Sequence, residues 1–328
     1  MKYVKFGKSE LKVSKICLGG MTYGDPKSGH HPWVLNEQES RPFIRRALDL
    51  GINFFDTANM YSYGAGERVL GNALKDYAKR DQIVIATKVF FPMVKEDPKS
   101  GGLSRKAILR EIDASLKRLG TDYVDLYQIH RWDNQVPIEE TLEALNDVVK
   151  AGKARYIGAS SMFTWQFVKA IYTSRHNSWA EFIAMQPHYN LLYREEEREM
   201  LLFCESEDIA VIPWSPLARG RLARPWKSET TMREQTDQFA TKLYQASENS
   251  DQKIVEQVIA LAKQRNIPPS QIALAWVLQN PLITAPIIGA TKPQHLEDAV
   301  AALSVNLSEE DIAKLEEYYV PHAIAGFS

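Results

Sequence analysis

Eight short apolar runs recur along the chain, spaced roughly 30 residues apart, and most are followed by an amphipathic stretch. The runs cover 14–20, 53–58, 83–89, 124–130, 154–160, 182–188, 210–217 and 285–291. Near-continuous apolar runs are typical of strands that are covered on both faces, as in a parallel sheet. Strands that alternate with helices at this spacing predict an α/β fold, a (β/α)8 TIM barrel that forms one domain over residues 1–328. A doubly wound open sheet is the alternative.

The stretches between the runs repeat their apolar residues at helical spacing. The clearest stripes are Ile108-Ile112-Leu116-Leu119, Ile138-Leu142-Leu145-Val149 and Ile254-Val258-Leu261. Ser104 stands where it would cap the start of the first of these helices, and Gly152 stands where it would end the second.

Three segments lie outside this alternation. Residues 2–13 predict an N-terminal β-hairpin with Gly7 in its turn, placed to cap the bottom of the barrel. Residues 218–250 predict a long polar loop after the seventh strand, of the kind that acts as a lid or a binding loop. Residues 318–328 form an aromatic and apolar C-terminal tail that either closes over a site or packs on the surface.

Composition narrows the classes of partner. The 328 residues include 40 basic and 41 acidic residues, so the formal net charge is −1 and we expect neither nucleic acid nor a membrane as a partner. The two cysteines, Cys17 and Cys204, are too few for a disulfide framework. The first residues lack the apolar core of a signal peptide, and no apolar run is long enough to span a bilayer. We therefore expect a cytoplasmic protein that acts on a small molecule; the sequence does not predict its oligomeric state.

Polar side chains stand at the ends of several predicted strands. Asp56 ends the second strand, Lys88 the third and His130 the fourth, and Tyr61 follows Asp56 by five positions. In a barrel of this type the carboxyl ends of the strands form the active-site face, so these four side chains should converge.

The residue types suggest an acid catalyst. A lysine within the apolar run 83–89 is costly without a partner, and Asp56 on the neighbouring strand is the obvious one. A lysine ammonium beside Tyr61 favours the phenolate and makes the hydroxyl a stronger acid. His130 would orient a substrate oxygen or relay the proton. Because no serine or cysteine pairs obviously with a base, the attacking species is expected to be a hydride from a bound cofactor.

The chain resembles the aldo-keto reductase family over nearly its whole length. The resemblance lies in seven motifs in the family's order: NFFDTANMY, IATKV, DLYQIH, YIGASS, MQPHYN, IPWSPLARG and PIIGAT. The segment 131–160 is especially similar to the bacterial branch, which also resembles the potassium-channel β subunits. The resemblance implies a catalytic tetrad of Asp56, Tyr61, Lys88 and His130, and an NADP-dependent reduction of aldehyde or ketone carbonyls to alcohols.

The resemblance also implies NADP(H), bound without a G-x-G-x-x-G fingerprint, which this sequence lacks. Trp214 would stack on the nicotinamide, Gln186 and Ser160 would hold its carboxamide, and Asp56 would lie nearby. The other implied contacts run from the centre of the cofactor to its adenosine end: Gly20, Met21, Ser215, Leu217, Arg219, Gly220, Gly289, Thr291, Lys292, His295 and Asp298. Lys292, Arg219 and Arg221 offer cations for a 2′-phosphate.

Two other functions and two kinds of substrate stay open. One alternative is a non-catalytic binding or sensory subunit that keeps the cofactor and uses it as a redox signal. The other is a metal-dependent hydrolase with His130, His188, Asp56 and a modified Lys88 as ligands. The hydrolase is disfavoured because the first strand offers no histidine; we expect no metal. For an apolar substrate, the site would have an apolar wall formed by Trp33, Tyr63, Phe90, Trp132, Met162 and Trp226. An anionic or sugar-like substrate would be held by Arg131, His188 and the basic residues of 218–250.

Overall fold

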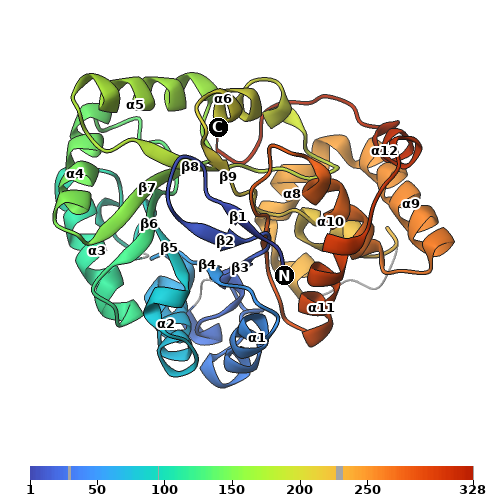
Figure 1. Ribbon diagram of the computed structural model, residues 1–328, viewed down its shortest axis with the longest axis horizontal. Coiled ribbons are helices and arrows are strands. Elements are labelled where there is room, and N and C mark those ends of the chain that lie inside the picture. The colour runs from blue at the N-terminus through green and yellow to red at the C-terminus, as the bar shows by residue number, and fades with distance from the viewer. Residues whose placement is uncertain (29–30, 95, 227–231, 328) are drawn as a thin grey trace.

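The computed structural model describes residues 1–28, 31–94, 96–226 and 232–327 (Figure 1). Eight parallel strands form the central sheet in the order β10-β3-β4-β5-β6-β7-β8-β9. These strands are β3 (Cys17–Gly19), β4 (Phe54–Asp56), β5 (Val84–Val89), β6 (Val124–Ile129), β7 (Ala154–Ser160), β8 (Phe182–Gln186), β9 (Ala210–Val211) and β10 (Ile287–Ile288). Each lies within one of the eight apolar runs, so the predicted strands are confirmed.

β10, the last strand in the sequence, closes the sheet into a ring because it lies between β3 and β9. β10 pairs with β3 through Ile287 and Ile288. On the other side, the backbone N–H of Thr284 donates to Val211 O at 2.8 Å, and that of Ile287 donates to Pro213 O at 2.9 Å. This arrangement is the predicted (β/α)8 barrel rather than an open doubly wound sheet.

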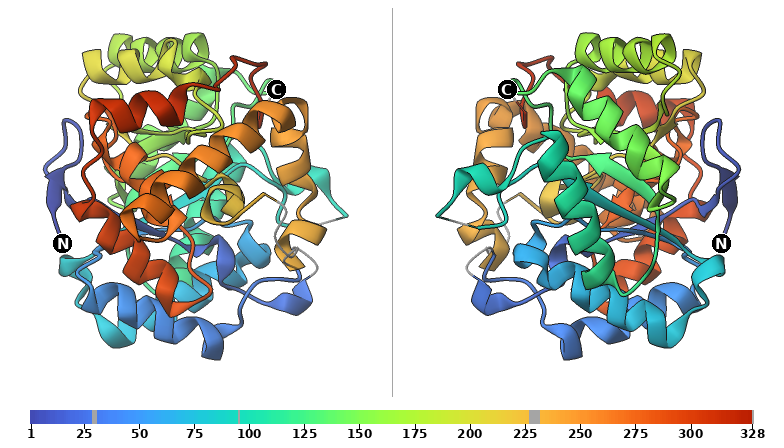
Figure 2. Two further views of the ribbon diagram at one scale, coloured as in Figure 1. Left: turned by 90° about the vertical axis from the view of Figure 1, so that its right-hand side faces the viewer. Right: turned by 90° about the vertical axis from the view of Figure 1, so that its left-hand side faces the viewer.

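Helices surround the ring (Figures 1 and 2). They are α1 (Glu37–Asp49), α2 (Ala65–Tyr77), α3 (Arg105–Leu119), α4 (Ile138–Lys150), α5 (Thr164–His176), α6 (Met200–Ser206), α7 (Met232–Thr236), α8 (Gln238–Tyr244), α9 (Glu248–Arg265), α10 (Pro269–Gln279), α11 (Pro293–Ala301) and α12 (Glu309–Glu316). The three helices predicted from apolar stripes are α3, α4 and α9. Ser104 caps α3 by accepting a hydrogen bond from the N–H of Ala107, and Gly152 follows the end of α4 at a φ of +71°, both as expected.

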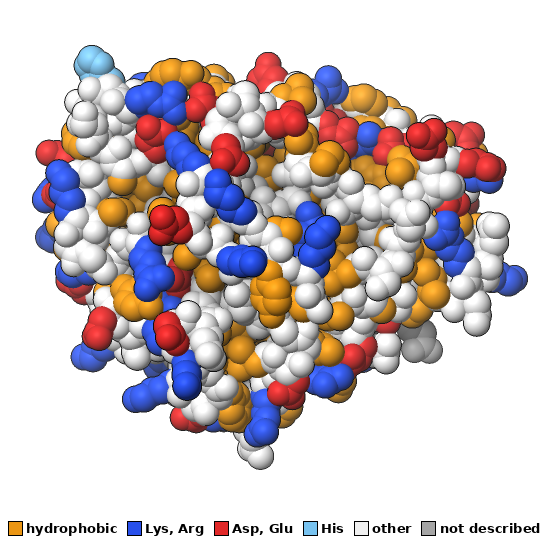
Figure 3. Space-filling model, in the orientation of Figure 1, with side chains coloured by type: hydrophobic (Ala, Val, Ile, Leu, Met, Phe, Trp, Pro, Cys, Tyr) orange, Lys and Arg blue, Asp and Glu red, His pale blue; other side chains and the backbone are white. Residues whose placement is uncertain are grey.

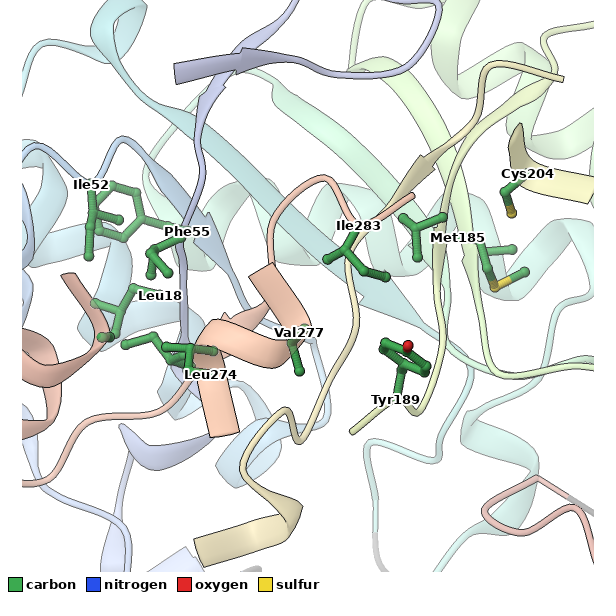
Figure 4. Close-up of a cluster of buried hydrophobic side chains, with 14 of the residues drawn as sticks. Leu18, Ile52, Phe55, Met185, Tyr189, Cys204, Leu274, Val277 and Ile283 are labelled. Carbon is green, nitrogen blue, oxygen red and sulfur yellow. The ribbon is translucent and has the colours of Figure 1, made fainter. Parts of the chain in front are cut away.

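Strand residues alternate between two cores. Phe55, Ile85, Tyr127 and Met185 point outward into the layer between strands and helices, part of which Figure 4 shows with Leu274 and Val277 of α10. Their sequence neighbours point into the ring, where they fill its lower part: Phe54, Ala86, Leu126 and Ala184. The barrel interior is therefore packed from below, and only its upper part is left for a site.

The N-terminal hairpin closes the bottom of the barrel, as predicted. Strands β1 (Tyr3–Lys5) and β2 (Lys12–Ser14) pair antiparallel. Phe6 meets Phe54 edge to face, with ring centroids 5.5 Å apart. Gly7 has a φ of +53°, and a Cβ there would stand 2.7 Å from Asp208 O, so this turn needs glycine for both conformation and space.

The segment 218–250 differs from the predicted long loop. The part that the structure describes contains a 3₁₀ turn at Ala218–Ala223 and the helices α7 and α8, and α9 already begins at Glu248. Residues 227–231 lie outside the described residues. Asp237 caps α8 by accepting from the N–H of Ala240, a signal that the polar composition concealed. Figure 2 shows this segment at the end of the barrel opposite the hairpin.

The C-terminal tail packs over the same end as this segment. Tyr319 donates a hydrogen bond to Glu195 at 2.7 Å, and the N–H of Ala325 donates to the Tyr193 hydroxyl at 3.3 Å. Gly326 lies against the Trp214 ring. The tail thus packs against segments next to Trp214, and closure over a site stays a prediction.

Acidic and basic side chains are interspersed on the face that carries the hairpin (Figure 3). Within the described ranges, every helix is too short or too polar to cross a membrane.

Candidate active site

The alternation of the strands places a polar layer directly above the apolar interior. Two positions beyond Phe54, Ala86, Leu126 and Ala184 come Asp56, Lys88, Gln128 and Gln186, and all four side chains are buried. Lys88 and Gln128 are register partners in neighbouring strands. A period of two therefore delivers these four groups to one level of the barrel.

Lys88 and Asp56 form a buried ion pair at this level. Lys88 is fully buried, and its Nζ contacts Oδ1 of Asp56 and donates to the carbonyl oxygen of Thr57 at 2.9 Å. Burial alone lowers the pKa of a lysine, but the charges of Asp56 and Tyr61 outweigh it, and the pKa of Lys88 is raised. The ion pair therefore favours the charged form of the lysine at neutral pH.

Two amides hold the other oxygen of Asp56. Gln128 and Gln186 donate their Nε2 hydrogens to Oδ2 of Asp56 at 2.9 and 3.0 Å, and Gln186 also donates to Oε1 of Gln128 at 3.2 Å. Gln128 was not predicted from the sequence, although a glutamine inside a fully buried strand was a usable signal. Gln186 was expected to hold a cofactor carboxamide; its amide nitrogen is here engaged by Asp56.

Tyr61 stands on the turn after β4, with its hydroxyl 3.5 Å from Nζ of Lys88. The next residues, Ser62 and Tyr63, both have a φ of +48°, and Gly64 has a φ of +87°. Three consecutive residues in the left-handed region make a costly turn that persists only where its surroundings enforce it. The turn fixes the direction in which the tyrosine leaves the backbone.

A buried ionic network lies under this turn. Glu67, fully buried in α2, pairs with Arg118 of α3 at 2.5 Å and accepts from the Thr87 hydroxyl at 2.6 Å. Glu111 accepts from Asn59 Nδ2 at 3.1 Å. A Cβ at Gly64 would stand 2.5 Å from Cδ of Arg118, so the arginine packs directly against the turn. The network ties the segment around Tyr61 to two helices, and sequence spacing gave no sign of it.

His130 completes the group predicted at the strand ends. Its ring meets that of Tyr61 edge to face with centroids 5.9 Å apart, and it meets the Phe91 ring edge to face with centroids 4.9 Å apart. The tetrad of Asp56, Tyr61, Lys88 and His130 is thus brought together.

These side chains lie on the floor of one large cavity of about 1230 Å³. Asp56, Tyr61 and His130 line it, whereas Lys88 lies behind them. All the residues that the family resemblance implied for cofactor binding line the same cavity: Gly20, Met21, Asp56, Ser160, Gln186, Trp214, Ser215, Leu217, Arg219, Gly220, Gly289, Thr291, Lys292, His295 and Asp298.

The Trp214 ring is fixed by a hydrogen bond from its nitrogen and by stacking on one of its faces. Its Nε1 donates to the Ser161 hydroxyl at 2.9 Å, and its ring stacks on His188 at 4.2 Å. His188 is fully buried between Trp214 and Tyr193, and burial, followed by nearby arginines and His322, lowers its pKa well below the usual range. The suggestion that His188 holds a substrate or a metal is therefore wrong: it is a neutral ring that supports Trp214.

The expected apolar wall is only partly correct. Trp33 lines the cavity, but Tyr63, Phe90, Trp132, Met162 and Trp226 do not. Phe91 takes the place foreseen for Phe90, because β5 ends at Val89 and the change of chain direction breaks the alternation. Met60 and Phe239 also line the cavity and were missed.

Two arginines of the 218–250 segment share one carboxylate. Arg219 pairs with Asp237 at 2.5 Å, and Arg233 approaches the same oxygen at 3.4 Å. Arg233 also lies over the ring of Trp33, 4.5 Å from its centroid, and so joins the segment to another residue of the cavity lining. Arg221 does not line the cavity; it packs over Trp226 and Tyr244, which removes it from the candidates for a phosphate contact.

The far lobe of the cavity ends at the start of α11. Lys292 is the exposed N-cap residue of this helix, and the N–H of Thr291 donates to Nδ1 of His295 at 3.3 Å. Burial, together with the charge of Lys292, lowers the pKa of His295. Asp298 accepts from Gln271 at 3.0 Å and Gln294 at 2.9 Å. A lysine beside free backbone N–H groups has the chemistry of an anion site.

No group of three or more His, Cys, Asp or Glu side chains has the arrangement of a metal site among the described residues. The four ligands considered for a hydrolase are not assembled, because His188 faces Trp214 and not the cavity.

Comparison with known proteins gives a consistent result. Residues 15–320 match the sequence profile of the aldo/keto reductase family. Versiconal hemiacetal acetate reductase of Aspergillus parasiticus is 46% identical, over 99% of this chain and 98% of its own length. An aldo-keto reductase of Fusarium vanettenii is 43% identical and the aldo-keto reductase dtxS3 of Metarhizium robertsii 42% identical; each match covers 99% of this chain and 93% of the relative. These relatives are fungal, so the expected closeness to the bacterial branch and the potassium-channel β subunits is not supported.

Proposed function

The chain belongs to the aldo/keto reductase family, and from that premise we propose that it reduces an aldehyde or ketone to an alcohol with NADPH as the reductant. One observation carries the proposal. A fully buried lysine, paired with Asp56, presents its ammonium to the hydroxyl of Tyr61 on the floor of a deep cavity. A buried cation next to a tyrosine hydroxyl is an arrangement suited to giving up the proton of that hydroxyl.

The cavity residues fit a nicotinamide dinucleotide. The cavity volume of about 1230 Å³ exceeds what a small carbonyl compound needs. The lobe beyond Trp214 offers the basic start of α11 and also Gly289, where Thr22 is the one described residue near the position of a Cβ. Trp214 offers a flat face whose opposite side is supported by His188. NADPH, when bound, would supply the hydride.

The roles of the protein's own residues follow from their positions. Tyr61 would donate its hydroxyl proton to the carbonyl oxygen of the substrate. Lys88 would stabilise the phenolate that remains, and Asp56 would keep the ammonium in place. His130, whose ring adjoins that of Tyr61, would hold the carbonyl oxygen near the donor. The cavity walls would exclude bulk water, which strengthens these charge interactions.

The test is a direct assay. Purified protein is mixed with NADPH and a panel of aldehydes and ketones, and loss of nicotinamide absorbance is followed. We expect turnover that falls at least about a hundredfold in Lys88→Met, the size of a general-acid contribution. Lys314→Met, which changes a surface lysine, is the matched control and should behave as the wild type. Absence of turnover on every carbonyl compound, or equal activity of the two variants, would refute the proposal.

We also propose that the protein works in a reducing compartment such as the cytoplasm. Cys17 and Cys204 are both free and buried. A thiol that is buried and unpaired is compatible with such a compartment.

A further inference from the structure

A guanidinium group stands beside the reactive tyrosine without a carboxylate partner. Arg131 follows His130 directly and lines the cavity. Its Nη1 donates to the carbonyl oxygen of His130 at 2.6 Å, and its Cζ lies 5.6 Å from the centroid of the Phe91 ring. In the part of the chain that the structure describes, no acidic side chain forms an ion pair with it.

Two other arginines that line the cavity do form ion pairs with a carboxylate. Arg219 and Arg233 share the carboxylate of Asp237. Among the described residues, by contrast, the contacts of Arg131 are with a backbone carbonyl and an aromatic face. Burial lowers its pKa to about 10, against a smaller opposing effect of Tyr61. The guanidinium remains charged at neutral pH in a partly buried position, and none of the described acidic side chains forms an ion pair with it there.

The position of Arg131 places this charge close to the proposed reaction. The ring of Tyr61 contacts that of His130, which in turn contacts the ring of Phe91, and the Arg131 guanidinium lies over the Phe91 ring. A substrate ring that lay against Phe91 with its carbonyl at Tyr61 would bring its other substituents toward the guanidinium. A planar, bidentate donor in that place suits a carboxylate.

We propose that Arg131 selects substrates that carry a carboxylate in addition to the carbonyl group, and in particular aromatic aldehydes with both groups on one ring. This assignment rests on the proposed reductase function and names the substrate class of the same site. The carboxylate would replace the missing ion-pair partner of Arg131. Loss of such a charge-assisted contact changes affinity by about ten- to a hundredfold.

The experiment compares acids with their uncharged esters. The compounds are 3- and 4-carboxybenzaldehyde and the methyl esters of both, assayed with NADPH for kcat/KM. In the wild type we expect at least one acid to be preferred to its ester by about ten- to a hundredfold. Arg131→Gln should abolish that preference, and Arg131→Lys, which keeps the charge but not the fork, should retain part of it. A wild-type acid-to-ester ratio near one, or one that Arg131→Gln leaves unchanged, overturns the proposal.

Two controls distinguish selection by Arg131 from a general effect of positive charge in the cavity and from a failure of turnover. Arg233→Gln removes a different cavity cation; an equal loss of the acid-to-ester ratio would assign selection to the general positive potential and overturn the role of Arg131. Calorimetric binding of benzoate against benzamide, which needs no turnover, tests the contact if no aldehyde is reduced. Benzoate that binds better than benzamide only when Arg131 is present would support the contact even where the proposed reductase function had failed.

Discussion

Removing Arg118 should expose how strongly the turn around Tyr61 depends on buried charge. Arg118 neutralises Glu67, which is fully buried and whose other partner among the described residues is the Thr87 hydroxyl. Glu111, the second acid of the network, retains Arg110 at 2.9 Å and Asn59. Arg118→Met therefore leaves one uncompensated buried carboxylate, and removal of one partner of such a pair costs about 3–5 kcal/mol.

Urea unfolding of the wild type and three variants measures this cost. Arg118→Met should lower the unfolding midpoint by an amount that corresponds to about 3–5 kcal/mol, whereas the double variant Arg118→Met/Glu67→Gln should recover a substantial part of it. Arg155→Met is the matched control, because its partner Asp125 keeps Arg80 at 2.8 Å; we expect a loss below about 1 kcal/mol. A double variant that is no more stable than Arg118→Met would refute the reasoning.

Three further predictions concern Glu196, Lys292 and the pair of Lys88 and Asp56. Glu196 is buried, and desolvation, with a smaller effect of Glu195, raises its pKa to about 8, so the native state favours its protonated form. Because this carboxyl destabilises the native state fully only once the pH passes about 8, Glu196→Gln should raise the urea midpoint more at pH 9 than at pH 5. An equal change at both pH values would contradict this. Lys292→Ala should weaken NADPH binding by about ten- to a hundredfold and leave NADH nearly unaffected, as judged by tryptophan quenching; equal losses would mean that the lysine only supports its loop. Lys88→Met and Asp56→Asn should each reduce kcat, and the double variant should lose far less than the product of the two, whereas independent losses would show that they do not act as a unit.

Much of the fold was predictable because the barrel repeats a local rule. Each buried strand needed only a short apolar run, and the helices α3 and α4 carried their own caps and stripes. The same repetition predicted that Asp56, Lys88 and His130 would meet, because parallel strands end at one edge. The 218–250 segment escaped prediction because its helices are short and mostly polar, and their stability comes from contacts such as Arg219 with Asp237.

The parts of the site that the sequence did not predict depend on tertiary contacts. Glu67 and Arg118 are 51 positions apart, and nothing local distinguishes either from a surface charge. His188 resembles a site residue by its place near a strand end, yet its ring turns toward Trp214. The prediction for the apolar wall named Phe90 instead of Phe91, because the in-and-out alternation of side chains ends with β5 at Val89. In each case, the side chain's direction is set by a neighbour that is distant in sequence.

The most direct test of the proposed chemistry is single-turnover reduction by Tyr61→Phe. This change removes only the hydroxyl that lies 3.5 Å from Lys88. We predict that the rate of NADPH oxidation within the ternary complex falls by about 10²–10⁴-fold, while NADPH affinity changes little. Tyr63→Phe, two residues along the same turn and outside the cavity lining, should react at the wild-type rate. Wild-type reduction by Tyr61→Phe would show that this hydroxyl is not the proton donor.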